Sequence, residues 1–272
     1  MLYLIATPIG NLGDITLRAI ETLRAADAVF CEDTRRTASL LTHLGIEKPL
    51  ISCHAHNERM RSEQLVAMLS EGKEIAYVSD AGMPAVSDPG AVLVRACLAH
   101  DLPFTVVPGA SAVLTAAVLS GLDPQPFSFF GFLPRETKPK NEMLDAIAKT
   151  AHLCILYESP HRVCATLKAL HERLGDCDAA VLRELTKKFE TACRGTLSEL
   201  IARFREEPKG ECVICVLPKC REGEGADPHA LLDELLKSLS VKDAAAVAAE
   251  RLHISKKQAY ALALEHRAKE ER

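Results

Sequence analysis

The sequence of 272 residues contains no tryptophan, and aromatic residues make up only 4% of it. Platforms for base stacking are therefore few, which disfavours a protein that holds single-stranded nucleic acid along an aromatic groove. An excess of basic residues is also missing, because the formal net charge is −4. A broad positive field that binds nucleic acid non-specifically is excluded, so any RNA contact must be local.

Long apolar runs are absent too, since none approaches the roughly 20 residues needed to cross a bilayer. The first apolar run, residues 2–6, meets Pro8 and Gly10 at once, which indicates a strand and not a signal peptide. The ten cysteines are scattered along a chain that is too large to need disulfide staples. These features predict a soluble cytoplasmic protein with reduced thiols and no membrane contact.

One close cysteine pair, Cys212 and Cys215, lies in a run that reads as a buried strand. Residues three apart on a strand point to opposite faces, so the two thiols are not placed to share a metal. Small buried apolar thiols are the favoured interpretation, and a metal or redox role is the alternative. We therefore predict no metal site.

The first 120 residues alternate short apolar runs with segments of helical period, as expected for a parallel sheet covered by helices. Segment 14–26 is a predicted helix with Asp14 as its cap. A linker is predicted at 120–126, where one glycine and two prolines interrupt the pattern. The strands expected in this first α/β domain, residues 1–120, are 2–6, 28–31, 50–54, 74–79 and 104–107.

A second α/β domain is expected over 121–222, with strands at 127–132, 152–157, 179–182 and 212–217. Its predicted helices cover 141–149, 162–174 and 197–206. From 223 to 272 the chain is predicted to be helical, and its last two helices resemble a helix-turn-helix. Because acidic and basic residues are balanced there, an appendage that serves packing or dimer formation is the favoured interpretation.

Three glycine-bearing loops follow predicted strands, at residues 7–16, 79–90 and 108–112. Parallel α/β sheets place ligand-binding loops at the carboxyl ends of their strands. The first loop fits neither a P-loop nor a dinucleotide fingerprint, and alone it could be a tight turn. The second packs two aspartates, two prolines and two glycines into twelve residues, which favours a site for an adenosine or a methionine tail.

Eight strings, in order, resemble the ribosomal RNA ribose methyltransferase branch of the tetrapyrrole methylases. They include Thr-Pro-Ile-Gly-Asn-Leu-Gly-Asp-Ile-Thr from residue 7, Cys-Glu-Asp-Thr-Arg from 31 and His-Ala-His-Asn-Glu from 54. The others are the loops from 79 and 108, Gly-Phe-Leu-Pro from 131, Tyr-Glu-Ser-Pro-His-Arg from 157 and Arg-Glu-Leu-Thr-Lys from 183. The first and second loops differ from those of porphyrin-modifying members, which disfavours a tetrapyrrole substrate.

This resemblance implies a two-domain tetrapyrrole-methylase fold of α/β class, with S-adenosylmethionine in the interdomain cleft and a C-terminal helical extension. It also implies a homodimer that methylates the 2′-hydroxyl of a cytidine ribose in 16S ribosomal RNA of the small subunit. A tetrapyrrole methylase and a non-catalytic RNA-binding module are the alternatives. The cofactor-binding residues carried over by motif are Ile9, Gly10, Val78, Ser79, Asp80, Met83, Ser111, Ala112, Tyr157, Glu158 and Gly195.

A protonated ribose hydroxyl is a poor nucleophile, so methyl transfer to it calls for a group that takes up the proton. Asp33 and His54 match the acid–base positions of the porphyrin methylases, and both are candidate catalytic residues. The alternatives are that Asp33 pairs with a neighbouring arginine and that His54 is a hydrogen-bonded histidine at a strand end. Cations expected to contact RNA phosphates are Arg35, Arg36, Arg59, Arg61, Arg135, Arg162, Arg183 and Lys187.

Overall fold

The first α/β unit is a five-stranded parallel sheet of mostly apolar strands, of which the three central ones are the most buried. The computed structural model of the protein describes residues 1–219, 228–236, 239–251 and 255–270. The strands are β1 (Leu2–Ile5), β2 (Ala28–Cys31), β3 (Leu50–Ser52), β4 (Ile75–Val78) and β5 (Phe104–Val107), in the order β3-β2-β4-β1-β5. The five predicted strands are thereby confirmed, with ends that differ by one or two residues.

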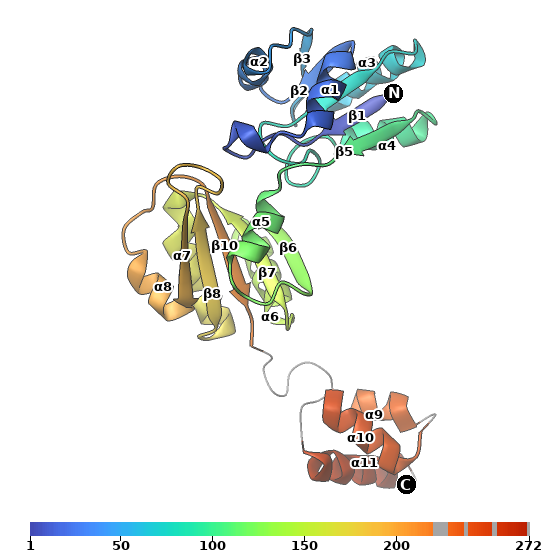
Figure 1. Ribbon diagram of the computed structural model, residues 1–272. Coiled ribbons are helices and arrows are strands. Elements are labelled where there is room, and N and C mark those ends of the chain that lie inside the picture. Colours follow the sequence, from blue (N-terminus) through green and yellow to red (C-terminus); the bar gives the residue numbers. More distant parts are fainter. Residues whose placement is uncertain (220–227, 237–238, 252–254, 271–272) are drawn as a thin grey trace.

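Helices cover both faces of this sheet, as the alternation of apolar runs and helical segments predicts (Figure 1). One face packs against α1 (Leu17–Ala25) and α2 (Thr34–His43), and the other against α3 (Glu58–Ser70) and α4 (Ala91–Ala99). The cap of α1 was predicted wrongly. Thr16 is the cap, accepting a hydrogen bond from the Ala19 amide at 3.1 Å, because Asp14 ends a separate 3-10 turn, Leu12–Asp14, whose own cap is Asn11.

The second α/β unit has a mixed sheet of order β6-β7-β10-β8-β9, in which only β6 and β7 are parallel. Its strands are β6 (Phe127–Phe132), β7 (Leu153–Glu158), β8 (Asp178–Arg183), β9 (Thr191–Thr196) and β10 (Cys212–Leu217). One face is covered by α6 (Thr137–Ala148), α7 (Val163–Leu174) and α8 (Leu197–Arg203). Cys212 and Cys215 face opposite sides of β10, as predicted.

The other face of the second sheet is covered by α5 (Ala112–Leu119), which the sequence places in the first domain. Val113, Ala116 and Ala117 pack against apolar side chains of β7, β8 and β10. Since α5 is apolar around most of its surface, its sequence does not say which sheet it covers. The packing puts the change of unit between β5 and α5, about ten residues before the predicted boundary at 120.

The C-terminal helices α9 (Pro228–Leu236), α10 (Val241–Arg251) and α11 (Lys256–Glu270) form a separate alanine- and leucine-rich core (Figure 1). The predicted turn between the last two helices is His-Ile-Ser from residue 253, and its first two residues lie outside the described residues. Across the part of the chain that the structure covers, no helix has the length and apolarity to span a membrane. The nine cysteines in the same part are all free thiols.

Candidate functional site

A cavity of about 400 Å³ lies between the two α/β units. The first unit lines it with the loops that follow β1, β4 and β5, at the carboxyl ends of the parallel strands. The second unit lines it with the ends of β6 and β7, the loop after β8 and the start of β10. The wall is mostly apolar, with a few hydroxyl and carboxyl groups, which is the composition of a small-molecule site.

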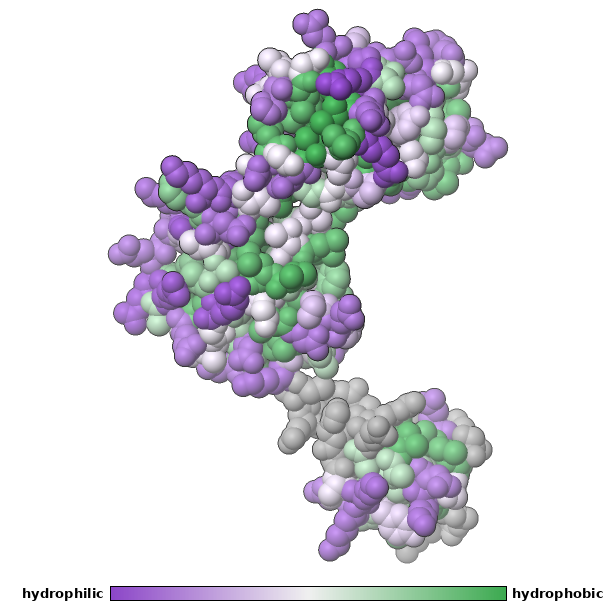
Figure 2. All heavy atoms as spheres, in the orientation of Figure 1, coloured by the Kyte–Doolittle hydropathy of each residue, from purple (hydrophilic) through white to green (hydrophobic). Residues whose placement is uncertain are grey.

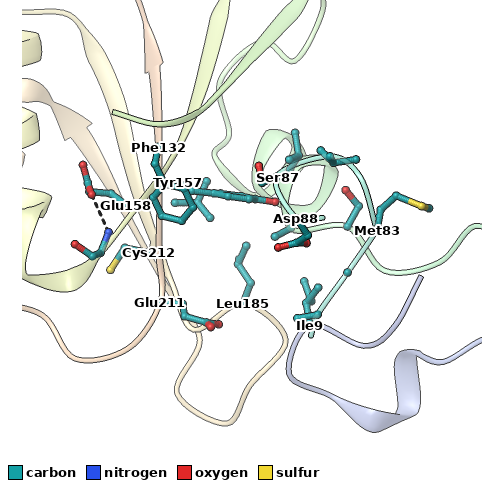
Figure 3. Close-up of a pocket in the computed structure, with 18 of the residues that line it drawn as sticks. Ile9, Met83, Ser87, Asp88, Phe132, Tyr157, Glu158, Leu185, Glu211 and Cys212 are labelled. Carbon is teal, nitrogen blue, oxygen red and sulfur yellow. Dashed lines mark hydrogen bonds between the residues drawn. The ribbon is translucent and has the colours of Figure 1, made fainter. Parts of the chain in front are cut away.

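Six of the eleven predicted cofactor residues line this cavity, namely Ile9, Met83, Ser111, Ala112, Tyr157 and Glu158. The ring of Tyr157 packs edge-on against Phe129 and Phe132, with centroids 4.8 and 5.6 Å away, so one wall is rigid and aromatic. Figure 3 shows Met83, Ile9 and Asp88 opposite Tyr157 and Phe132 across the cavity.

The other predicted cofactor residues lie elsewhere. Val78, Ser79 and Asp80 line a neighbouring polar cavity of about 290 Å³ beside α2. Gly10 lies under the stem of Lys187, where a Cβ would come within 2.4 Å of that side chain. Gly195 is on β9, where a Cβ would meet the carboxylate of Glu199 and no cavity wall. The structure therefore does not bring these five residues into the cavity between the units.

The wall residues that sequence reasoning missed include Asp88, Phe132, Leu185, Glu211 and Val213. Asp88 lies in the loop that the sequence singles out, so its motif could have marked it. Phe132 and Leu185 lie in recognised strings as well, whereas Glu211 and Val213 carry no local signal. Glu211 and Val213 become wall residues only because β10 pairs between β7 and β8.

Carboxylates gather at the edge where the cavity meets the sheet of the first unit. Burial raises the pKa of Asp88, and the charge of Asp80 raises it further, against a lowering hydrogen bond from Ser79. Burial likewise raises the pKa of Glu32, with further increases from Asp80 and Asp88. On the opposite wall, burial followed by the charges of Asp88 and Glu211 raises the pKa of Tyr157 to about 12. Glu32, Asp80 and Asp88 thus lie close enough for their charges to interact at this edge, where Arg36 pairs with Asp80.

The loop after β4 is held to its surroundings at three places. Thr7 and Gly82 exchange backbone hydrogen bonds of 2.9 and 3.0 Å, which join it to the first loop. Asp80 accepts from the Asp33 amide at 3.1 Å and pairs with Arg36 at 3.3 Å. Gly90 ends the loop at φ +134°, where a Cβ would lie 2.9 Å from the Tyr77 ring. The wall residues of this loop are thus positioned in advance of any ligand.

At the third of these places, Glu58 on the neighbouring helix α3 binds the end of the loop at Gly90. Its buried carboxylate accepts hydrogen bonds from the backbone amides of Gly90 and Val92, at 2.7 and 3.2 Å. The carboxylate therefore both fixes the end of the loop and satisfies the first turn of α4.

Replacing Glu58 with alanine should reduce the free energy of unfolding by about 1–3 kcal/mol, because two buried amides lose their acceptor. Amide hydrogen exchange at residues 88–92 should accelerate, and urea unfolding measures the loss of stability. Glu58→Gln keeps an acceptor oxygen and should lose less, while Glu63→Ala, at an exposed position on the same helix, is the control. An unchanged exchange rate at residues 88–92 would show that Glu58 does not hold the loop.

The predicted catalytic residues follow β2 and β3, as expected, but neither lines the cavity. Asp33 caps α2 by accepting from the Arg35 amide at 2.8 Å, and this bond lowers its pKa. The amide of His54 donates to Asn57 at 2.8 Å, while the ring atom Nδ1 is buried without a hydrogen-bond partner. The catalytic assignment of both residues stays a prediction.

The eight predicted RNA-binding cations divide into two groups of four. Arg35, Arg36, Arg59 and Arg135 are exposed, although Arg35 pairs with Asp33 at 3.6 Å and Arg36 with Asp80 at 3.3 Å. The other four, which are less exposed, bind within the protein. Arg61 donates to the Ser52 carbonyl and Gln64, Arg162 to the Leu133 carbonyl, Arg183 to Thr191, and Lys187 to Glu184 and Glu211. Solvent-exposed cations that a phosphate backbone can reach are thus concentrated in the first group.

The family was established by comparison with known proteins. A model of the family described as Tetrapyrrole (Corrin/Porphyrin) Methylases matches residues 1–201. Two α/β units with a cavity between them agree with that match, and the chain belongs to this family. A second model, described as RsmI C-terminal HTH domain, matches residues 222–267.

Three relatives are each named Ribosomal RNA small subunit methyltransferase I. The protein of Synechocystis sp. is 43% identical over 272 residues, covering 97% of this chain and 98% of its own. The protein of Vibrio cholerae is 42% identical over 273 residues, covering 98% of this chain and 95% of its own. The protein of Bacillus subtilis is 48% identical over 217 residues, covering 79% of this chain and 74% of its own. The predicted branch of the family is thereby confirmed.

Two solved structures share the fold at low sequence identity. Diphthine synthase superposes with a TM-score of 0.62 at 18% identity, covering 80% of this chain and 90% of its own. A uroporphyrin-III-C-methyltransferase from Thermus thermophilus gives a TM-score of 0.55 at 20% identity, covering 79% and 93%. At these identities the likeness establishes the two-unit fold alone.

Proposed function

We propose that the protein methylates the 2′-hydroxyl of a cytidine ribose in 16S ribosomal RNA of the small subunit, with S-adenosylmethionine as donor. The observation that carries this proposal is the 43% identity to a ribosomal RNA small subunit methyltransferase over nearly the full length of both chains. The cavity between the units supports it with a site of suitable size and chemistry.

S-adenosylmethionine fits what the cavity offers. A volume of about 400 Å³ lies in the range of small-ligand sites, and the wall combines aromatic and aliphatic side chains with hydroxyls. Ile9, Met83, Ser111 and Tyr157 are the residues that we propose to hold it, together with the exposed backbone of the loop after β4. When bound, this cofactor supplies a methyl group activated on a sulfonium.

A methylation assay tests the proposal directly. Purified small ribosomal subunits lacking the modification are incubated with the protein and S-adenosylmethionine, and the RNA is mapped by mass spectrometry. One cytidine should gain 14 mass units on its ribose, by the chemistry of methyl transfer. A porphyrinogen in place of the subunits is the control, since one structural neighbour is a uroporphyrin methyltransferase. Methylation of the porphyrinogen alone would overturn the assignment.

The RNA is proposed to lie along the carboxyl edge of the first sheet. Arg35 stands in the first turn of α2 and Arg59 in the first turn of α3, and both are exposed. Both helices begin at this edge, next to the loops that line the cavity. Because the chain as a whole is acidic, this local pair is well placed to bind phosphate.

Charge reversal at both positions, Arg35→Glu with Arg59→Glu, should weaken RNA binding about tenfold or more and flatten its salt dependence. Affinity for S-adenosylmethionine should stay unchanged, because neither side chain reaches the cavity wall. Filter binding at several salt concentrations and calorimetry measure the two affinities. Arg24→Glu, on an exposed site in the last turn of α1, is the matched control. Equal loss of both ligands would contradict a role specific to RNA.

A homodimer is proposed from the apolar surface of the second unit. Leu114 and Val118 on α5 expose 56% and 76% of their surface, and Phe127 at the start of β6 exposes 39%. Figure 2 shows apolar side chains gathered on the second unit next to its junction with the first, where Figure 1 places α5. Association of two copies through this face would cover it. Light scattering measures the mass of the assembly and tests this proposal.

We also propose a cytoplasmic location, because the proposed substrate is ribosomal RNA.

A further inference from the structure

The wall of the cavity between the units carries three carboxylates and no basic side chain. Glu158 is turned into the second unit, where it accepts from the Thr166 hydroxyl at 2.6 Å and the Ser159 amide at 2.9 Å. Glu211 accepts from the ammonium of Lys187 at 2.8 Å. Asp88 forms no ion pair with any residue of the described ranges. Asp88 accepts a hydrogen bond from Ser79, but of the three carboxylates it alone has no basic partner in the described ranges, so its charge is available to a ligand.

Asp88 is directed into the cavity. Figure 3 shows its carboxylate between Ile9 and Tyr157, in the space that separates the two units. Met83, Leu185 and Phe132 make the surrounding wall apolar. A half-buried carboxylate in such a wall gains little from water, so a cation that enters the cavity interacts with it strongly.

The methyl donor and its product differ by one charge. S-adenosylmethionine carries a sulfonium, whereas S-adenosylhomocysteine carries a neutral thioether, and the adenosine and amino-acid parts are the same. A wall that recognised only the shared parts would bind the two equally well. A preference for the donor therefore requires a group near the sulfur that attracts positive charge, and a carboxylate without a basic partner attracts it most strongly.

We propose that Asp88 is the counter-charge for the sulfonium of the methyl donor, and that it makes the cavity prefer the donor to the thioether product. This inference rests on the proposed use of S-adenosylmethionine. The role is specific to Asp88, because Glu158 and Glu211 are each paired with a basic side chain, Arg162 and Lys187. Once the methyl group has left, the attraction between Asp88 and the ligand weakens, which favours product release.

Three ligands and four proteins test the proposal by equilibrium calorimetry. The ligands are S-adenosylmethionine, S-adenosylhomocysteine and sinefungin, which carries an ammonium in place of the sulfonium. The proteins are the parent, Asp88→Asn, Asp88→Glu and Asp123→Asn. Asp123 lies exposed on the loop before β6 and accepts from the Gln125 amide, so its asparagine variant changes the same charge outside the cavity.

The parent should bind both cationic ligands about tenfold more tightly than the thioether, or better, by the Coulomb attraction of a partly screened pair. Asp88→Asn should bring all three affinities within about threefold of one another, chiefly by weakening the two cations. Asp88→Glu and Asp123→Asn should keep the preference. Circular dichroism confirms that each variant is folded, and Asp88→Ser replaces Asp88→Asn if that variant unfolds.

Three results would overturn the role of Asp88. An equal loss for all three ligands in Asp88→Asn would place the carboxylate on the shared amino group or adenosine, and unchanged affinities would place it outside the ligand's reach. A parent that binds S-adenosylhomocysteine as tightly as the donor overturns it as well. A parent that binds none of the three instead contradicts the proposed function, so the two failures are distinguishable.

Discussion

Replacing His54 with alanine should slow single-turnover methyl transfer by about 10²–10⁴-fold, the range expected for the loss of a general base. His54 follows β3 at the carboxyl edge of the first sheet, and its buried Nδ1 atom has no hydrogen-bond partner. An unpaired buried polar atom in a folded protein calls for an explanation, and a role in proton transfer is one. The proton of the ribose hydroxyl would pass to this imidazole as the new O–C bond forms.

The other predicted base, Asp33, should matter far less. Its carboxylate already accepts from the Arg35 amide, and its lowered pKa makes it a weak proton acceptor. Asp33→Asn preserves a helix cap of similar strength, so its single-turnover rate should stay within about threefold of the parent. Both variants are measured with RNA and donor saturating. A rate for His54→Ala within that same range would leave alignment of the substrate, worth about 7–11 kcal/mol, as the source of catalysis.

Replacing Glu158 with alanine should lower the free energy of unfolding by about 3–5 kcal/mol, because it breaks a buried ion pair and leaves its partners unpaired. The side chain of Glu158 is fully buried, and Arg162 lies 3.5 Å from its carboxylate while donating to the Leu133 carbonyl. The Thr166 hydroxyl and the Ser159 amide also lose their acceptor. Cofactor binding should weaken as a consequence, since Tyr157 next to it lines the cavity.

Urea unfolding of the parent and variants measures this effect. Thr166→Val removes one hydrogen bond from the same carboxylate and should cost only about 1–2 kcal/mol. Arg162→Ala should destabilise more than Thr166→Val, and the double variant with Glu158→Ala should be less than additive. A loss below about 1 kcal/mol in Glu158→Ala would show that the carboxylate does not hold this part of the second unit together. Because Arg162 pairs with Glu158 and donates to the Leu133 carbonyl, its substitution changes stability as well as charge, so Arg162 is unsuited to testing RNA binding.

The parallel sheet of the first unit was predictable because each strand is a short apolar run between helical segments. The loops were predictable as well, since their position after strands is written in the order of the elements. Strand β9, Thr191–Thr196, was not predicted, because its polar residues and Gly195 give no apolar run. It forms as an edge strand by pairing with β8 over six residues.

The sequence by itself determined the family, the first sheet with its helices, and the three loops that carry four of the six predicted residues found in the cavity wall. Only the tertiary structure decided that α5 covers the second sheet, that Arg61, Arg162, Arg183 and Lys187 bind within the protein, and that Asp88 faces the cavity without a basic partner. Apolar periodicity and turn residues act between neighbours in the chain, so a sequence displays them. The environment of a charge depends on groups brought together from distant segments, and packing alone sets it.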